Sequence, residues 1–392
     1  MQERVDLAGL PRVAEIGEDI EGLAELRRRS WAVRSDRGVE VLRFRQGLAA
    51  LEHKQLHKGA SFQRRLDDIG ITHGVARENW DRMLVTTEGE RRRKLRLPFI
   101  SLLRGPHLRQ LDEQIRGIVA GVLDELDDLP DVDLMAQIAW KVPARVYCHL
   151  VAAPMEHAPM VARLSDSTLA PILTGDRSRR QESIDAFDTT RDFVGRHLGE
   201  RRRAGLGDDF ASMMIRQQMD GLQTEDELVF EGIALLQASV DNTVHQIGLA
   251  LGALLERPER WQALVGQESL VEPGCEEAMR LEPRFGTVFR HAPEETMLEE
   301  LEIPADTWVF VSLRSANRDE AMFDDPSGFR FDRGLKRALQ FGGGPYSCLG
   351  QTLARMEIHA VVRAMRERFP TARMIGDWRR HDPDRPRGKK EG

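Results

Sequence analysis

Apolar residues recur every three or four positions over long stretches of the chain, which is the pattern of amphipathic helices. This spacing predicts helices over residues 108–126, 182–204, 225–256 and 348–369. Alternating patterns are fewer and predict short strands at residues 39–42, 287–290 and 308–312. The expected fold class is therefore mainly α with a minor β region. We expect one domain over residues 1–392, with a frayed basic tail at 377–392.

The helix predicted over residues 225–256 differs from the others. Thr224 and Glu227 form a capping-box pattern at its start, and Arg257-Pro258 stops it. Its middle, GIALLQASVDNTVHQIGLALGALL, is apolar on nearly every side. A helix of this kind is buried on all faces, so the pattern predicts a helix through the centre of the fold.

Composition excludes several classes of protein. The 392 residues are 41% hydrophobic, which is enough for a large core, and the net charge of -7 does not indicate a nucleic-acid binder. No window reaches the roughly 18 apolar residues of a membrane span, and the N-terminus has no secretory signal. Three cysteines, Cys148, Cys275 and Cys348, are too few for a disulfide framework or a zinc cluster. We expect a cytoplasmic protein whose cysteines are reduced.

The segment FGGGPYSCLG, residues 341–350, carries the main candidate chemistry. Its glycines allow the backbone to approach a flat partner closely. Cys348 is expected at the start of the last helix, where the helix dipole favours a thiolate. The shorter pattern Gly-Gly-Gly-x-x-x-Cys, taken alone, has an alternative interpretation. It also fits a free cysteine that follows a flexible loop and starts a helix.

The full pattern F-x-x-G-x-x-x-C-x-G resembles the haem-binding signature of the cytochrome P450 family. The resemblance implies a long central helix over haem b (iron protoporphyrin IX), with Cys348 as the metal ligand. Glu277 and Arg280 match the family's E-x-x-R, a structural pair. Arg290 stands ten residues later, where the family often places an arginine that binds a haem propionate.

The resemblance also implies which residues bind the cofactor. They are Arg93, Ala238, Arg290, Phe341, Gly342, Gly344, Tyr346, Cys348 and Gly350. Several positions depart from the family pattern. Tyr346 replaces the usual His or Arg, Ala338 and Gly89 stand where histidines are frequent, and the meander arginine is replaced by Gly328, with Arg330 nearby.

Ala238-Ser239-Val240-Asp241-Asn242-Thr243 aligns with the family's oxygen-activating kink, Ala-Gly-x-Asp/Glu-Thr. The candidate catalytic residues are Asp241, Asn242, Ser239 and Thr243. Asp241 keeps the acid, whereas Asn242 occupies the alcohol position. Thr243 is turned away by about 100° of helical rotation, and the Ser239 hydroxyl is expected to bend the helix or to hold water. The alternative is an irregular helix whose polar groups are simply satisfied.

The resemblance implies a bacterial oxidoreductase, a monooxygenase that activates dioxygen to oxidise a small organic molecule in secondary metabolism. The chain carries neither a dinucleotide fingerprint nor a flavin domain, so a ferredoxin and a ferredoxin reductase are the expected electron donors. Basic residues are expected to dock the ferredoxin: Lys336, Arg337 and residues 91–94.

Three alternatives stay open at this point. Asn242 is compatible with a coupling, cyclisation or peroxide-driven reaction in place of hydroxylation. A haem-binding sensor without catalysis is a second reading. In a third, Cys348 is a nucleophile, but His359 lies eleven residues along the same predicted helix, too far to act as its base.

Overall fold

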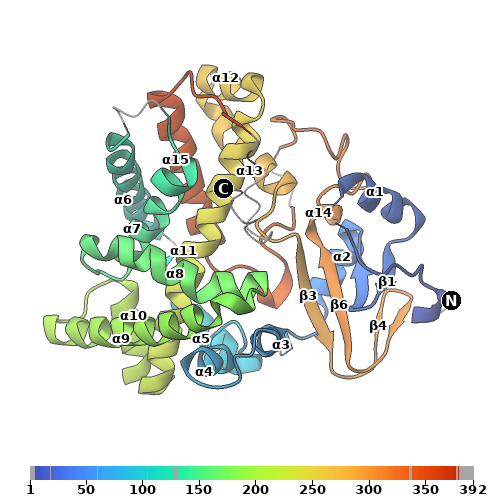
Figure 1. The fold of residues 1–392 in the computed structure, drawn as a ribbon, viewed down its shortest axis with the longest axis horizontal. Helices are drawn as coiled ribbons and strands as arrows, with labels where there is room; N and C mark the ends of the chain where they lie inside the picture. The colour runs from blue at the N-terminus through green and yellow to red at the C-terminus, as the bar shows by residue number, and fades with distance from the viewer. Residues whose placement is uncertain are drawn as a thin grey trace. The chain divides into compact units, whose positions relative to one another are not determined.

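The computed structural model describes residues 5–17, 19–59, 61–103, 105–126, 131–334, 338–376 and 378. Helices dominate and the strands form two small sheets, which confirms the predicted class of mainly α with minor β (Figure 1). The chain forms two compact units. The first comprises Met1–Gly59 and Gln267–Cys348, and the second comprises Ala60–Gly266 and Leu349–Gly392. Across the described ranges, no helix is both long and apolar enough to cross a membrane.

A four-stranded sheet organises the first unit. Its order is β1 (Ala32–Ser35), β2 (Gly38–Val41), β6 (Thr307–Ser312) and β3 (Thr287–Ala292). Strands β2 and β6 are parallel, and the other pairs are antiparallel; β3 and β6 lie side by side in Figure 1. A second sheet pairs β4 (Thr296–Leu298) with β5 (Leu301–Ile303). The three predicted strands are confirmed as β2, β3 and β6. The pattern missed β1, β4 and β5, which have four, three and three residues.

The first unit also contains four helices and three short turns in its described residues. They are α1 (Ile20–Arg29), α2 (Phe44–Glu52), α13 (Val271–Leu281) and α14 (Leu313–Ala316), with 3-10 turns η1 (Leu7–Gly9), η5 (Glu268–Leu270) and η6 (Gly344–Tyr346). Val41, Leu51 and Val311 are fully buried in one shared core. Helix α2 contacts both β6 and η6. The sheet therefore supports, through α2, the loop that leads to Cys348.

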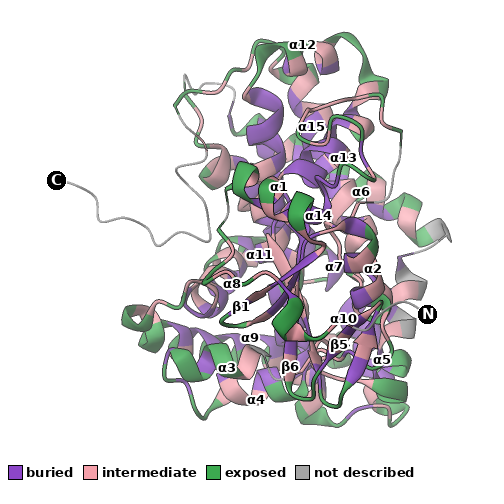
Figure 2. Cartoon of the chain, turned by 90° about the vertical axis from the view of Figure 1, so that its right-hand side faces the viewer, coloured by how far each residue is buried: buried purple, intermediate pink, exposed green. Residues whose placement is uncertain are grey.

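In the second unit, the regular elements of the described residues are helices. Its helices are α3 (Ser61–Asp68), α4 (Val75–Arg82), α5 (Gly89–Leu102), α6 (Gly105–Asp124), α7 (Lys141–Leu150), α8 (Ala158–Thr174), α9 (Arg180–Ala204), α10 (Phe210–Met219), α11 (Glu225–Leu255), α12 (Pro258–Gly266) and α15 (Gln351–Arg368). Short turns are η2 (Met135–Ala139), a π-helix, and the 3-10 turns η3 (Met155–His157) and η4 (Arg177–Arg179). Exposed positions, in green, mark the outer turns of α3, α4 and α12 in Figure 2.

Helix α11 is the centre of this unit, as its apolar pattern predicts. Its 31 residues contact α4, α7, α8, α9, α10, α12 and α15. The predicted capping box is confirmed: the Glu227 N–H donates to Thr224 Oγ1 at 3.2 Å, and the Thr224 N–H donates to Glu227 Oε2 at 2.8 Å. The helix ends at Leu255, just before Arg257-Pro258.

Two other predicted helices are confirmed as α6 and α9, but the last one was placed wrongly at its start. Helix α15 begins at Gln351, and Cys348 precedes it. The Cys348 N–H donates to the Phe341 carbonyl, and a turn at residues 349–350 leads into the helix. The predicted frayed tail lies outside the described residues except for Trp378, whose ring packs against Gly252 of α11.

A carboxylate is buried on α11 facing the loop after α4. Glu231 is 7% exposed and accepts the Leu84 N–H at 3.0 Å, while Arg92 donates to the Leu84 carbonyl. Burial raises the pKa of Glu231 to about 7, which outweighs the lowering by the Leu84 N–H and by the charge of Arg92. The folded pKa exceeds the ordinary value of 4.5, so the protonated carboxyl group of Glu231 favours the folded state. Its contribution to the free energy of unfolding is complete at low pH and is lost as the pH rises through about 7.

Replacement Glu231→Gln is expected to increase the free energy of unfolding at pH 8 by up to about 3 kcal/mol. The amide is neutral and still accepts the Leu84 N–H, so it avoids the burial of a charge. At pH 5 the gain disappears. Urea unfolding across pH 5–8 measures the effect, with the exposed Glu259→Gln as control. Parallel stability curves for wild type and Glu231→Gln would contradict this interpretation.

Candidate functional site

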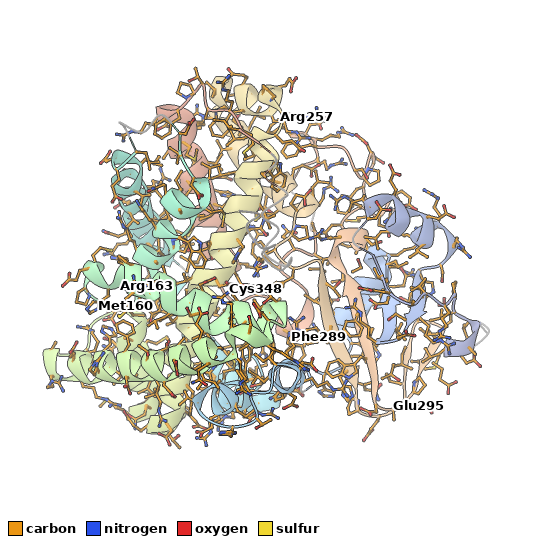
Figure 3. All side chains as sticks on the ribbon, in the orientation of Figure 1. Met160, Arg163, Arg257, Phe289, Glu295 and Cys348 are labelled. Carbon is orange, nitrogen blue, oxygen red and sulfur yellow. The ribbon has the colours of Figure 1, made fainter. Side chains whose placement is uncertain are left out.

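The loop before α15 presents Cys348 to the outside, while Cys148 and Cys275 are buried. Burial raises the pKa of the Cys148 thiol to about 12, so that thiol is inert. The Cys348 N–H donates to the Phe341 carbonyl at 2.9 Å and closes the loop. Inside it, the Ser347 N–H donates to the Gly344 carbonyl at 3.1 Å, which shapes η6. The backbone thus fixes the cysteine before the helix starts. Figure 3 labels Cys348, together with Phe289 of β3 in the same unit.

The loop glycines separate a packed side from an open side. Gly342 and Gly344 have φ of +71° and +64°, which strain any other residue. A Cβ on Gly344 would meet the Leu51 carbonyl oxygen at 2.3 Å, so only glycine lets this turn pack on α2. A Cβ on Gly342 or Gly350 would meet no atom of the described chain within 4 Å. Open space beside an exposed thiol fits a flat group bound at sulfur.

Arg290 holds the loop from β3. It is 2% exposed, and its Nη2 donates to the carbonyls of Leu51 and Gly343, each at 3.2 Å. Its guanidinium carbon lies 4.8 Å from the centre of the Tyr346 ring, in cation–π geometry. One arginine therefore ties α2, the glycine turn and Tyr346 together. Its role toward a propionate stays a prediction.

A buried charge cluster braces the segment before the loop. Arg280 donates to both carboxylate oxygens of Glu277 at 2.7 Å, and Arg333 Nε donates to Oε1 at 2.7 Å. Burial would raise the pKa of Glu277, but the hydrogen bonds from Arg280 and Arg333 outweigh it and lower the pKa. Arg280 also donates to the Asn317 and Pro326 carbonyls, at 2.6 and 2.7 Å.

The sequence interpretation had the meander arginine replaced by Gly328, with Arg330 nearby, whereas the structure has an arginine from this segment, Arg333, on Glu277. Arg333, rather than Arg330, pairs with Glu277; Arg330 pairs with Asp332 and offers Glu277 only its backbone N–H, at 3.1 Å. Both arginines lie in one short run, and sequence spacing alone does not say which of them folds back.

On α11, one face is open in the middle of an otherwise buried helix. Ala238 is exposed, and Leu235, Ser239 and Asn242 are partly exposed. These positions follow the i, i+3, i+4, i+7 spacing of one helical face. Asp241 and Thr243 are buried, at 1% and 5% exposure. The structure therefore groups Ala238, Ser239 and Asn242, and it turns Thr243 away from them.

The remaining predicted residues lie on α5. Arg93 is exposed and donates to Glu90 at 2.6 and 2.8 Å, so the structure places it in a surface ion pair. Its neighbour Arg91 pairs with Glu227. Lys336 and Arg337, predicted to dock a partner, lie outside the described residues.

Comparison with known proteins gives a consistent result. The family model described as Cytochrome P450 matches residues 149–373. Luteothin monooxygenase of Streptomyces thioluteus is 29% identical over 91% of this chain and 88% of its own. Nocardicin C N-oxygenase of Nocardia uniformis subsp. tsuyamanensis is 32% identical over 68% of this chain and 67% of its own. The solved structure of CxnD, a cytochrome P450 enzyme for C-S bond formation in chuangxinmycin biosynthesis, aligns with a TM-score of 0.80. It is 24% identical, covering 94% of this chain and 92% of its own.

Replacement Arg290→Met is expected to loosen the cysteine loop and to speed haem loss at least about tenfold. It removes charge-assisted hydrogen bonds of roughly 1.5–3 kcal/mol each. Transfer of haem to apomyoglobin measures the rate. The matched control is Arg45→Met, an arginine of the same unit whose side chain is 75% exposed. Equal rates for the two variants would show that Arg290 does not hold the loop.

Proposed function

Because the chain belongs to the cytochrome P450 family and is a monooxygenase-type oxidoreductase, we propose that it binds haem b at Cys348 and oxidises a small organic molecule. The exposed, backbone-fixed Cys348 beside open space carries this proposal. When bound, a thiolate-ligated haem supplies reductive activation of dioxygen. We take residues 1–392 to form a single catalytic domain.

The chain's own residues hold the cofactor in this proposal. Cys348 supplies the sulfur, and the Phe341 carbonyl keeps the Cys348 N–H in place. Gly342 and Gly350 leave room for the ring, and Gly344 lets the turn pack on α2. Ala238 on α11 is a further proposed cofactor-binding residue. Tyr346, Arg290 and Arg93 are the proposed partners of the propionates, through a hydroxyl and two guanidinium groups.

In this proposal, the buried Asp241 and the neighbouring open face of α11 together deliver protons. Asp241 supplies an acid that is shielded from bulk water. The Asn242 amide both donates and accepts hydrogen bonds, so it orders a water molecule where a hydroxyl would otherwise act. Ser239 lies on the same face and holds that water from the other side. Thr243 is buried and takes only a supporting part.

Electrons come from a ferredoxin and its reductase. Arg91 and Arg93 lie on α5 with exposed side chains, 48% for Arg91 and 64% for Arg93. A basic surface of this kind steers an acidic partner. Lys336 and Arg337 are also proposed to dock the ferredoxin.

The substrate is a specialised metabolite. This part of the proposal rests on the relatives, which are named for luteothin and nocardicin C. A second candidate function is oxidative coupling or cyclisation, and it is favoured by Asn242, which lies on the open face in place of an alcohol.

The proposal is tested by turnover with 18O2. Purified holoenzyme, a ferredoxin, its reductase and NADPH are incubated with a panel of bacterial metabolites. Incorporation of one labelled oxygen supports the proposed monooxygenase. An oxidised product without label supports coupling or cyclisation. Binding of a metabolite without any product would support the alternative that the protein is a haem-binding sensor without catalysis.

Replacement Asn242→Ala is expected to lower product formation per NADPH at least about tenfold and to raise release of hydrogen peroxide. The amide no longer orders the water, and positioned proton transfer contributes about 10²-fold or more. Asn242→Thr restores coupling, because a hydroxyl takes over the role. The exposed Gln181→Ala on α9 serves as control. Full coupling in Asn242→Ala would exclude this residue from the relay.

A further inference from the structure

Asp241 is nearly closed off from water. It is 1% exposed, on a helix that packs against seven others. A carboxyl group that gives up a proton in every cycle must recover one before the next. Because a buried group cannot exchange directly with bulk water, its proton returns through hydrogen-bonded water or through a second side chain that can take up and release a proton.

His245 lies one turn further along α11 and meets this requirement. Its Nδ1–H donates to the Asp241 carbonyl at 2.9 Å and lies 3.5 Å from Asp241 Oδ1. The His245 side chain is 14% exposed, against 1% for Asp241. The imidazole therefore contacts the buried acid and is the less buried of the two side chains.

The ring is also held in one orientation. Trp140, at the start of α7, meets the imidazole edge to face, with centroids 5.9 Å apart and an angle of 76° between the planes. Over the described part of the chain, Asp241 of its own helix and the neutral Trp140 are the groups that face His245.

We propose that His245 is the positioning residue that returns a proton to Asp241. The imidazolium gives its Nδ1 proton to Asp241 Oδ1, and the neutral imidazole then takes a proton from water. No bond between heavy atoms changes, and no electrons move. Imidazole suits this task because it exchanges protons between pH 5 and 8. The proposal rests on the proposed role of Asp241 as the proton-delivering acid.

The coupling between the two groups is tested first, without turnover. Labelled histidine in the reduced, CO-bound holoenzyme reports the two ring nitrogens of His245 by NMR. Replacement Asp241→Asn is expected to move the Nδ1 resonance, because the group 3.5 Å from Nδ1 changes from a carboxyl group to an amide. An Nδ1 resonance that stays in place would overturn the proposal.

Dioxygen consumption without organic substrate, driven by NADPH, ferredoxin and reductase, tests the relay itself. Replacement His245→Asn keeps an N–H donor but does not take up or release a proton near neutral pH, so the rate is expected to fall about tenfold or more, with a larger solvent deuterium isotope effect. His245→Gln gives a second variant should the first not fold. The control is His149→Asn on α7 of the same unit, which is expected to behave like wild type.

The outcomes separate the two proposals. If Asp241→Asn slows dioxygen consumption and neither His245 variant does, the assignment of His245 falls while the role of Asp241 stands. If Asp241→Asn leaves the rate unchanged, the proposed role of Asp241 falls and the assignment of His245 falls with it.

Discussion

The hydrogen bond from the Cys348 N–H to the Phe341 carbonyl is the interaction on which the candidate site depends. It closes a loop of glycines at positive φ and fixes the thiol outside the helix, where it stays exposed. In the first unit, several contacts stabilise this loop or the segment before it. Helix α2 backs the glycine turn, and Arg290 binds its carbonyls. The buried Glu277 cluster anchors the preceding segment. Breaking such a cluster costs about 3–5 kcal/mol, because it leaves a charge buried without its partner.

In the second unit, the main constraint is the burial of helix α11. Helix α11 buries its apolar faces against its neighbours and leaves one stretch open at Ala238, Ser239 and Asn242. Burial of Asp241 beside this stretch disfavours its charged form unless partners compensate. Burial shields the carboxyl group from uncontrolled exchange with bulk water, but it also slows the return of a proton after each transfer. We propose that His245, which is less buried than Asp241, returns this proton.

Sequence reasoning succeeded where one local rule acted without competition. The capping box at Thr224 and the apolar surface of α11 predicted a central helix correctly, because both signals concern one element. The start of α15 was wrong because a backbone bond to Phe341, seven residues earlier, overrides the helical tendency at Cys348. Arg333 was missed since its partner Glu277 lies 56 residues away. The contact between His245 and Asp241 shows as a four-residue spacing, but that spacing alone does not distinguish an ion pair from a helix surface.

The most direct measurement is the absorption spectrum of the reduced, CO-saturated protein after purification with haem. Thiolate ligation by Cys348 predicts a strongly red-shifted Soret band, because the sulfur donates electron density to the iron. A Soret band at the position of a histidine-ligated or neutral-thiol haem would contradict the account. So would the absence of haem from a folded protein.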